Sequence, residues 1–116
     1  MHLVSSVEAV ASRTPPLAWL FTDGHAVIDF SEYYTDISDL DKIDWAIMTS
    51  RYWHDTLEDG DRLRRRQAEF LTHQFFPWEL VSEIAVIDSR VANDVSRMIA
   101  TAAHVPKVAV RRDWYY

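Results

Sequence analysis

Cysteine is absent from this chain of 116 residues. Without a thiol, the chain forms no disulfide, binds no metal through thiolates and has no cysteine nucleophile. Long apolar runs are absent too, since none approaches the roughly 20 residues that a helix needs to cross a bilayer. The N-terminal residues also lack a basic leader with a long apolar stretch behind it. We therefore expect a cytoplasmic protein with no membrane anchor and no secretion signal.

Positive charge is in deficit as well, with a net charge of −6 and a pI near 5.2. Such a surface does not coat DNA or anionic lipid non-specifically. The arginines are nevertheless concentrated, because residues 62–66 hold four guanidinium groups, whereas residues 29–44 hold six carboxylates and one lysine. This separation of charge predicts one basic lip on an acidic body, so that any contact with a polyanion is local.

The length of the chain fits one domain and is too short for two ordinary ones. Hydrophobic residues make up 48% of the chain, which is enough to bury a core. We therefore expect residues 1–116 to form a single domain.

The local patterns predict alternating helices and strands. The spacing of Ser5 and Glu8 is that of a capping box, which predicts a helix that continues to about Arg13 and ends before Pro15-Pro16. The apolar run 17–21 is typical of a strand covered on both faces, and the turn signal Thr22-Asp23-Gly24-His25 follows it directly.

The acidic segment 29–44 is expected to form a helix or helical turns with a solvated acidic face. Metal binding by Asp36, Asp39 and Asp41 is the alternative. The segment has no glycine and does not fit a calcium-loop pattern, so we expect no metal site.

In the second half, further strands are expected at residues 45–53, 68–72, 84–87 and 107–112. Pro77 suits the start of a short helix, and Asp88 is expected to cap the clearest helix of the chain. The apolar residues of that helix share one face: Val91, Val95, Met98, Ile99 and Ala102. The order of elements predicts an α/β (α+β) fold, a mixed sheet with flanking helices.

The stretch with the most chemical character is residues 62–72, in which the arginine run leads to a single carboxylate, Glu69, at the edge of an apolar segment. Arginine holds phosphate in a planar, two-pronged grip, and Glu69 is the acid group within reach. The plainer alternative is a strand-edge glutamate paired with an arginine, beside a solvated loop or helix start that carries exposed charges.

Several segments taken in their order resemble the DarT family, the toxin enzymes that ADP-ribosylate DNA. They are Phe21-Thr22-Asp23-Gly24-His25-Ala26, Asp41-Lys42-Ile43-Asp44-Trp45, Arg51-Tyr52-Trp53, Gln67-Ala68-Glu69-Phe70-Leu71, Phe76-Pro77-Trp78-Glu79-Leu80 and Arg111-Arg112-Asp113-Trp114-Tyr115-Tyr116. The resemblance implies an ADP-ribosyltransferase-like mixed sheet and makes Glu69 the catalytic residue.

The resemblance covers nearly all of this chain but only about the C-terminal half of the family. It implies that the domain is truncated at its N-terminus. The family's NAD-binding histidine and asparagine and its catalytic arginine are then expected upstream of Met1. For the isolated chain we accordingly expect weak or no NAD binding, and calorimetry that shows micromolar binding would refute this.

The implied reaction uses NAD as co-substrate and no metal. The bond between nicotinamide and ribose breaks through an oxocarbenium-like state, and a base of single-stranded DNA captures the sugar. A carboxylate stabilises the developing cation and can accept the proton of the incoming base. Thymidine is the expected acceptor, and guanosine, the acceptor of another branch of the family, stays open.

The residues expected to contact DNA surround this carboxylate. Gln67 lies two positions before Glu69, on the same face of an extended segment, and is expected to hydrogen-bond the acceptor base. Tyr52 and Trp53 are expected to stack on bases. The other expected contacts are Arg51, Arg64, Arg65, Arg66 and His25. The resemblance also implies a partner, a DarG-like macrodomain antitoxin that removes the modification.

Two other classes of function remain open. One is a non-catalytic module that binds single-stranded nucleic acid through residues 62–66 and the pair Tyr52-Trp53. Salt-dependent binding that is unaffected by Glu69→Gln, without label transfer from NAD, would favour it. The other is a degenerate remnant, for which a broad, uncooperative thermal transition would be the sign.

Overall fold

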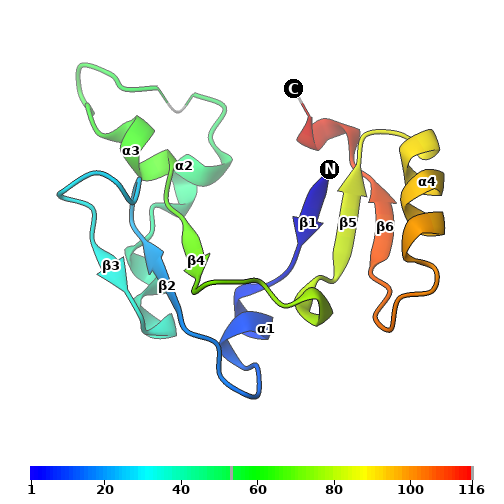
Figure 1. The fold of residues 1–116 in the computed structure, drawn as a ribbon. Helices are drawn as coiled ribbons and strands as arrows, with labels where there is room; N and C mark the ends of the chain where they lie inside the picture. The colour runs from blue at the N-terminus through cyan, green and yellow to red at the C-terminus, as the bar shows by residue number, and fades with distance from the viewer. Residues whose placement is uncertain (53, 116) are drawn as a thin grey trace. The chain divides into compact units, whose positions relative to one another are not determined.

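The computed structural model describes residues 1–52 and 54–115. The chain divides into two compact units (Figure 1). The first unit consists of Met1–Arg13 and Phe75–Tyr116, and the second is Thr14–Gln74. Both combine strands with helices, which confirms the expected α+β fold. The single domain stays a prediction.

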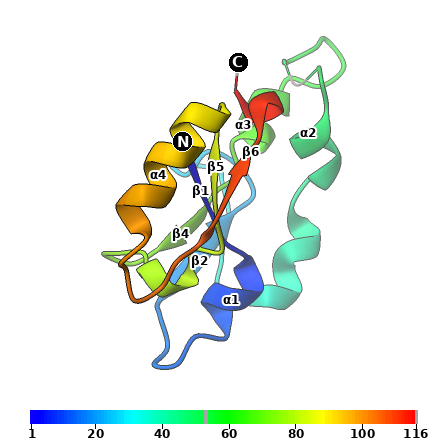
Figure 2. The ribbon, with the colours of Figure 1, turned by 90° about the vertical axis from the view of Figure 1, so that its right-hand side faces the viewer.

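The first unit is built on a mixed three-stranded sheet in the order β1 (His2–Val4), β5 (Glu83–Val86) and β6 (Lys107–Val110). β1 runs antiparallel to β5, and β6 runs parallel to it. Helix α4 (Ser89–Ile99) connects the two parallel strands and lies alongside them (Figures 1 and 2).

Helix α4 begins where the sequence predicts, because Asp88 accepts a hydrogen bond from the amide of Val91 at 2.9 Å. Three residues of α4 spaced four apart, Val91, Val95 and Ile99, belong to the hydrophobic core of this unit. The buried residues of the core are Val81, Ile84, Val86 and Val95, and the partly buried residues packed against them are Val91, Ala92, Ile99 and Val108. Met98 shares the apolar face of α4 by its spacing but is 78% exposed, so this face is not buried along its whole length. The buried stripe is narrower than the pattern suggested, and α4 packs mainly against β6 and β5.

Replacing the cap residue gives a simple test of this unit. Asp88→Ala removes the acceptor for the first turn of α4 and is expected to lower the free energy of unfolding by about 1 kcal/mol. Urea denaturation followed by circular dichroism measures the change. Asp94→Ala is the matched control, because it removes an exposed carboxylate that pairs with Arg97 inside the same helix. A control that loses as much stability as Asp88→Ala would contradict the capping role.

The remaining elements of the first unit are short. Helix α1 (Val7–Ala11) is capped by Ser6, whose hydroxyl accepts from the amide of Ala9. The capping box predicted from Ser5 was therefore one residue out, because the Ser5 hydroxyl donates to the carbonyl of Leu80 instead. Two 3-10 helices complete the unit, η2 (Trp78–Leu80) behind Pro77 and η3 (Arg112–Trp114).

The second unit contains an antiparallel sheet in the order β3 (Tyr33–Tyr34), β2 (Trp19–Thr22) and β4 (Phe70–Thr72). Aromatic rings stack across it: the Phe21 and Tyr34 centroids lie 5.3 Å apart, and those of Trp19 and Phe70 lie 5.4 Å apart. Phe21 is buried. Such cross-strand pairs fix the register of so short a sheet, and this register brings Glu69, just before β4, next to the end of β2.

Three helices follow or precede these strands: η1 (Ile37–Lys42), α2 (Trp45–Thr49) and α3 (Arg62–Arg66). The helical turns expected in the acidic segment are confirmed by η1, although part of that segment forms β3. The strand expected at residues 45–53 was wrong. The carboxylate of Asp44 accepts from the amide of Ile47 at 3.1 Å and so starts a helix where the aromatic and β-branched content suggested a strand.

Candidate active site

Glu69 is held at the junction of β2 and β4 by its backbone. Its carbonyl accepts from the amide of Thr22 at 2.9 Å, and its own amide donates to the Thr22 hydroxyl at 3.0 Å. The same hydroxyl donates to the carbonyl of Gly24 at 2.6 Å, and Thr22 is fully buried. One buried hydroxyl therefore links the start of β4 to the turn that follows β2.

The side chain of Glu69 is exposed, and its Oε2 accepts a hydrogen bond from the amide of Ala26 at 3.3 Å. Ala26 belongs to the β2–β3 loop, residues 23–32. This contact fixes the direction of the carboxylate while leaving it accessible. Among the salt bridges of the described residues, none involves Glu69, so the alternative of a glutamate paired with an arginine is not supported.

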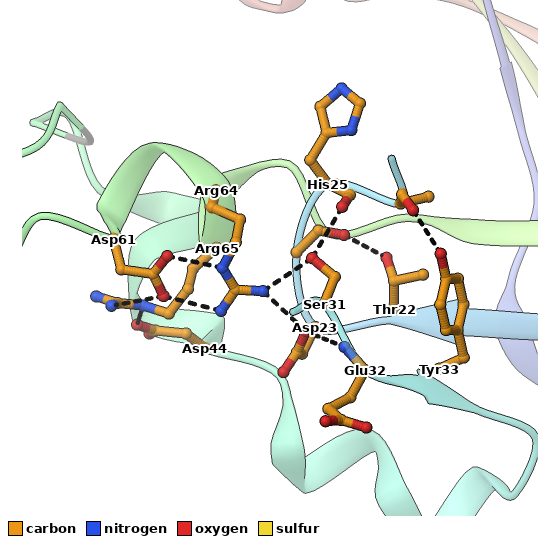
Figure 3. A network of polar contacts seen from close by, with 12 residues as sticks. Thr22, Asp23, His25, Ser31, Glu32, Tyr33, Asp44, Asp61, Arg64 and Arg65 are labelled. Carbon is orange, nitrogen blue, oxygen red and sulfur yellow. Dashed lines mark hydrogen bonds and ion pairs between the residues drawn. The ribbon is translucent and has the colours of Figure 1, made fainter. Parts of the chain in front are cut away.

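The β2–β3 loop is itself tied to the end of helix α3. The amide of His25 donates to the carbonyl of Arg64 at 3.0 Å, and the hydroxyl of Ser31 donates to the carbonyl of His25 at 2.8 Å. The hydroxyl of Tyr33 donates to the carbonyl of Ala26. Figure 3 shows that the ring of His25 points away from the Arg64 network. Its Nδ1 accepts from the amide of Val27 at 3.2 Å.

Arg64 lies at the centre of this network, and its side chain is only 11% exposed. Its Nε and Nη2 donate to the two carboxylate oxygens of Asp61 at 2.7 and 2.8 Å. Its Nη1 donates to Asp23 and to the hydroxyl of Ser31, both at 3.0 Å (Figure 3). The guanidinium also lies over the ring of Phe30, 4.8 Å from its centroid. The hydrogen bond from Arg64 lowers the pKa of Asp61, and the same bond raises the pKa of Arg64.

Arg65 is also paired with carboxylates. Its Nε donates to Asp44 at 2.9 Å, and its two terminal nitrogens grip the carboxylate of Asp59. Hydrogen bonding by Arg65 lowers the pKa of Asp59 to about 2. Two of the arginines expected in a basic lip are thus neutralised by aspartates that come from three different segments of the second unit.

The depressed pKa of Asp59 predicts how stability depends on pH. Its folded pKa of about 2 lies below its ordinary value of 3.8, so the ion pair stabilises the fold above pH 3.8 and this contribution is lost as the pH falls through about 2. We expect the thermal midpoint to drop between pH 4 and pH 2, and to drop less in Asp59→Asn. An equal drop in both proteins, measured by scanning calorimetry, would contradict the pairing.

The other two arginines of the run differ from these. Arg62 donates to the carbonyl of Tyr52 and lies 3.5 Å from the hydroxyl of Ser50. Arg66 makes one long contact, 3.9 Å from Nη1 to the sulfur of Met48. Its Nε is buried and, within the part of the chain that the structure describes, has no hydrogen-bond partner.

The remaining predicted DNA contacts lie on the surface. Gln67 is exposed at the C-cap of α3, and its amide donates to the carbonyl of Arg64 at 3.1 Å. Arg51 is exposed, and Tyr52 is 76% exposed. Trp53 lies outside the described residues. None of these side chains has its role tested by the structure, and each stays a prediction.

Sequence reasoning missed the aspartates that organise the arginines. Asp61 lies three positions before Arg64, a spacing at which side chains meet on a helix, and this signal was readable. Asp23 lies 41 positions before Arg64, so no local spacing in the sequence indicated that the two side chains pair. Among residues 1–52 and 54–115, no group of three histidine, aspartate or glutamate side chains could hold a metal ion, and no helix has the length and apolarity needed to span a membrane.

Solved structures with this fold include Thermus sp. 2.9 DarT in complex with NAD+ and the same protein in complex with ADP-ribosylated ssDNA. Both match with a TM-score of 0.87 and 37% identity, over 99% of this chain and 57% and 54% of those chains. The fold is therefore one found in DNA ADP-ribosyltransferases.

The sequence comparisons lead to the same class. A DNA ADP-ribosyl transferase of Thermus aquaticus is 40% identical over 100% of this chain, and one of Escherichia coli O127:H6 is 32% identical over 98%. The family model described as ssDNA thymidine ADP-ribosyltransferase, DarT, matches residues 1–116, and the chain belongs to the DarT family. This confirms the resemblance drawn from the motifs. The chain spans about half the length of the curated relatives that it matches, 50% and 51% of these two. That this half is the C-terminal one stays a prediction.

Proposed function

We propose that this chain supplies the catalytic glutamate and the acceptor side of an NAD-dependent ADP-ribosyltransferase that modifies thymidine in single-stranded DNA. The observation that carries the proposal is the placement of Glu69 in a chain that matches the family throughout. Its backbone is locked by buried Thr22, and its exposed carboxylate is oriented by the amide of Ala26. A carboxylate held in this way is preorganised, which is what electrostatic stabilisation of a transition state requires.

In the proposed reaction the N-glycosidic bond of NAD breaks, and nicotinamide leaves with the bonding electron pair. A nitrogen of the thymidine base attacks C1 of the ribose and loses its proton. The carboxylate of Glu69 stabilises the positive charge that develops on the ribose and accepts that proton, so that one group serves two steps. NAD is the co-substrate, and no metal takes part.

Four side chains are proposed to receive the DNA. Gln67 is exposed two residues before Glu69 and would hydrogen-bond the acceptor base. The terminal nitrogens of Arg66 make only a long contact among the described residues, 3.9 Å from Nη1 to the sulfur of Met48, which favours Arg66 as a phosphate contact. Exposed Arg51 and Tyr52 would add a phosphate contact and a stacking surface.

Two further assignments follow from family membership. A DarG-like macrodomain antitoxin is proposed as the partner that reverses the modification. His25 is proposed as a substrate contact, because its ring points away from the Arg64 network and its backbone lies next to Ala26 (Figure 3).

The test uses labelled NAD and single-stranded oligonucleotides that differ only in one central base. The protein that carries this chain is expected to transfer label to the thymidine oligonucleotide and not to those with adenine, cytosine or guanine. Transfer to guanine alone would contradict the thymidine assignment. Binding of all four oligonucleotides without any transfer would favour the non-catalytic nucleic-acid-binding module instead.

A further inference from the structure

We propose that Arg64 is a positioning residue for Glu69, acting through the β2–β3 loop, and not a DNA contact. This inference rests on the proposed function, because it assigns to Arg64 the task of holding the loop whose Ala26 amide orients the catalytic carboxylate. It differs from the expectation that the whole arginine run faces the nucleic acid.

The donors of Arg64 are already used inside the protein. A guanidinium has five N–H donors, and those of Arg64 make two hydrogen bonds to Asp61, one to Asp23 and one to Ser31. Its face is covered by the ring of Phe30, and only 11% of the side chain is exposed. Binding a phosphate would require Arg64 to break its two-pronged pair with Asp61, so an intact Arg64 has little capacity for DNA.

The acceptors of Arg64 flank the residue that holds Glu69. Asp23 and Ser31 lie on either side of Ala26 in the β2–β3 loop, and the guanidinium joins them through a single nitrogen, Nη1. Ser31 passes the contact on, because its hydroxyl accepts from Arg64 and donates to the carbonyl of His25, the residue before Ala26. The β2–β3 loop is therefore closed around the guanidinium.

The backbone of Arg64 contributes a second tie to the same place. Its carbonyl accepts from the amide of His25 at 3.0 Å, and the next amide, that of Ala26, reaches the carboxylate of Glu69. Two consecutive amides thus join the end of α3 to the catalytic side chain. Moving Arg64 moves the donor that orients Glu69.

Gly24 is the third part of the arrangement. A Cβ built on Gly24 would lie 2.3 Å from Nη1 of Arg64 and 3.0 Å from its Cγ and Cζ. The backbone of Gly24 has no positive φ, so the need for glycine here comes from space and not from conformation. The absence of a side chain lets the guanidinium pass directly against the loop.

The experiment compares Arg64→Lys and Gly24→Ala with wild type in the protein that carries this chain. Arg64→Lys keeps the charge but loses the planar fork, and Gly24→Ala pushes the guanidinium away without touching it chemically. Each is expected to lower kcat by about ten- to a hundredfold, because a small misplacement of a catalytic group costs that much. KM and Kd for single-stranded DNA, and the salt dependence of binding, are expected to stay within twofold of wild type.

Two further proteins complete the kinetic test. The double variant Arg64→Lys with Gly24→Ala is expected to be no slower than the worse single variant, since both disturb one contact. Arg66→Gln is the contrasting variant: as a phosphate contact it should raise Kd for single-stranded DNA and flatten the salt dependence of binding. An Arg64→Lys protein with wild-type kcat and a weaker, less salt-dependent Kd would overturn the proposal.

A readout that does not need activity separates this inference from the proposed function. The ¹⁵N–¹H resonance of Ala26 is expected to shift in Glu69→Gln, and to shift in the same direction in Arg64→Lys and in the milder Ser31→Ala, but not in Arg66→Gln. If wild type transfers no label, the proposed function fails, and the Ala26 resonance still decides the role of Arg64. An unchanged Ala26 resonance in folded Arg64→Lys would overturn it.

Discussion

Glu69→Gln is expected to lower kcat for ADP-ribosyl transfer by about 10²–10³-fold, the typical loss when one preorganised group of a transition-state site is removed. The amide of glutamine keeps the size of the side chain and can still accept from the amide of Ala26. It cannot stabilise the oxocarbenium-like ribose or accept the proton of the base. KM for single-stranded DNA and the thermal midpoint are therefore expected to stay near wild type.

The control for this change is Glu58→Gln, which removes an exposed carboxylate from the loop before α3. It alters the net charge by the same amount and should leave kcat unchanged. Single-turnover kinetics with labelled NAD separates the chemical step from product release. A Glu69→Gln protein with wild-type kcat would remove Glu69 from the mechanism.

The second large effect is expected for Thr22→Val. The buried Thr22 hydroxyl accepts from the amide of Glu69 and donates to the carbonyl of Gly24. Valine has nearly the same shape but leaves both backbone groups without that partner, so the free energy of unfolding is expected to fall by about 1–3 kcal/mol. Since the displaced backbone belongs to Glu69, kcat is expected to fall about tenfold or more as well.

Thr22→Ser is the matched control, because it keeps the hydroxyl and removes only a methyl group. It should retain most of the activity and lose less stability than Thr22→Val. Chemical denaturation and the transfer assay measure the two effects on the same protein. If Thr22→Val and Thr22→Ser behave alike, the hydroxyl does not organise the site.

Local signals in the sequence predicted the parts of the fold that depend on neighbouring residues. The cap at Asp88, the short helix behind Pro77 and the turn after β2 all follow from side chains within a few positions. The helix at residues 45–49 was missed, because the capping carboxylate of Asp44 outweighed the strand-like composition that follows it. The helical periodicity placed Met98 on the apolar face of α4 but could not show that this residue is 78% exposed.

In the candidate site, the sequence indicated the important residues but not their interaction partners. The motif around Glu69 marked it as the candidate catalytic carboxylate by resemblance, and the structure adds three hydrogen bonds to Thr22 and Ala26 that hold this residue. The four arginines within residues 62–66 predicted one continuous basic surface. The carboxylates that neutralise Arg64 and Arg65 come from as far as 41 residues away, so their positions depend on the tertiary fold.

The most direct measurement is the mass of a single-stranded oligonucleotide with one thymidine after incubation with NAD and the protein that carries this chain. Addition of one ADP-ribose unit on the thymidine base by wild type, and none by Glu69→Gln at the same time point, is the predicted result. Equal modification by the two proteins, or modification on a phosphate or a different base, would contradict it.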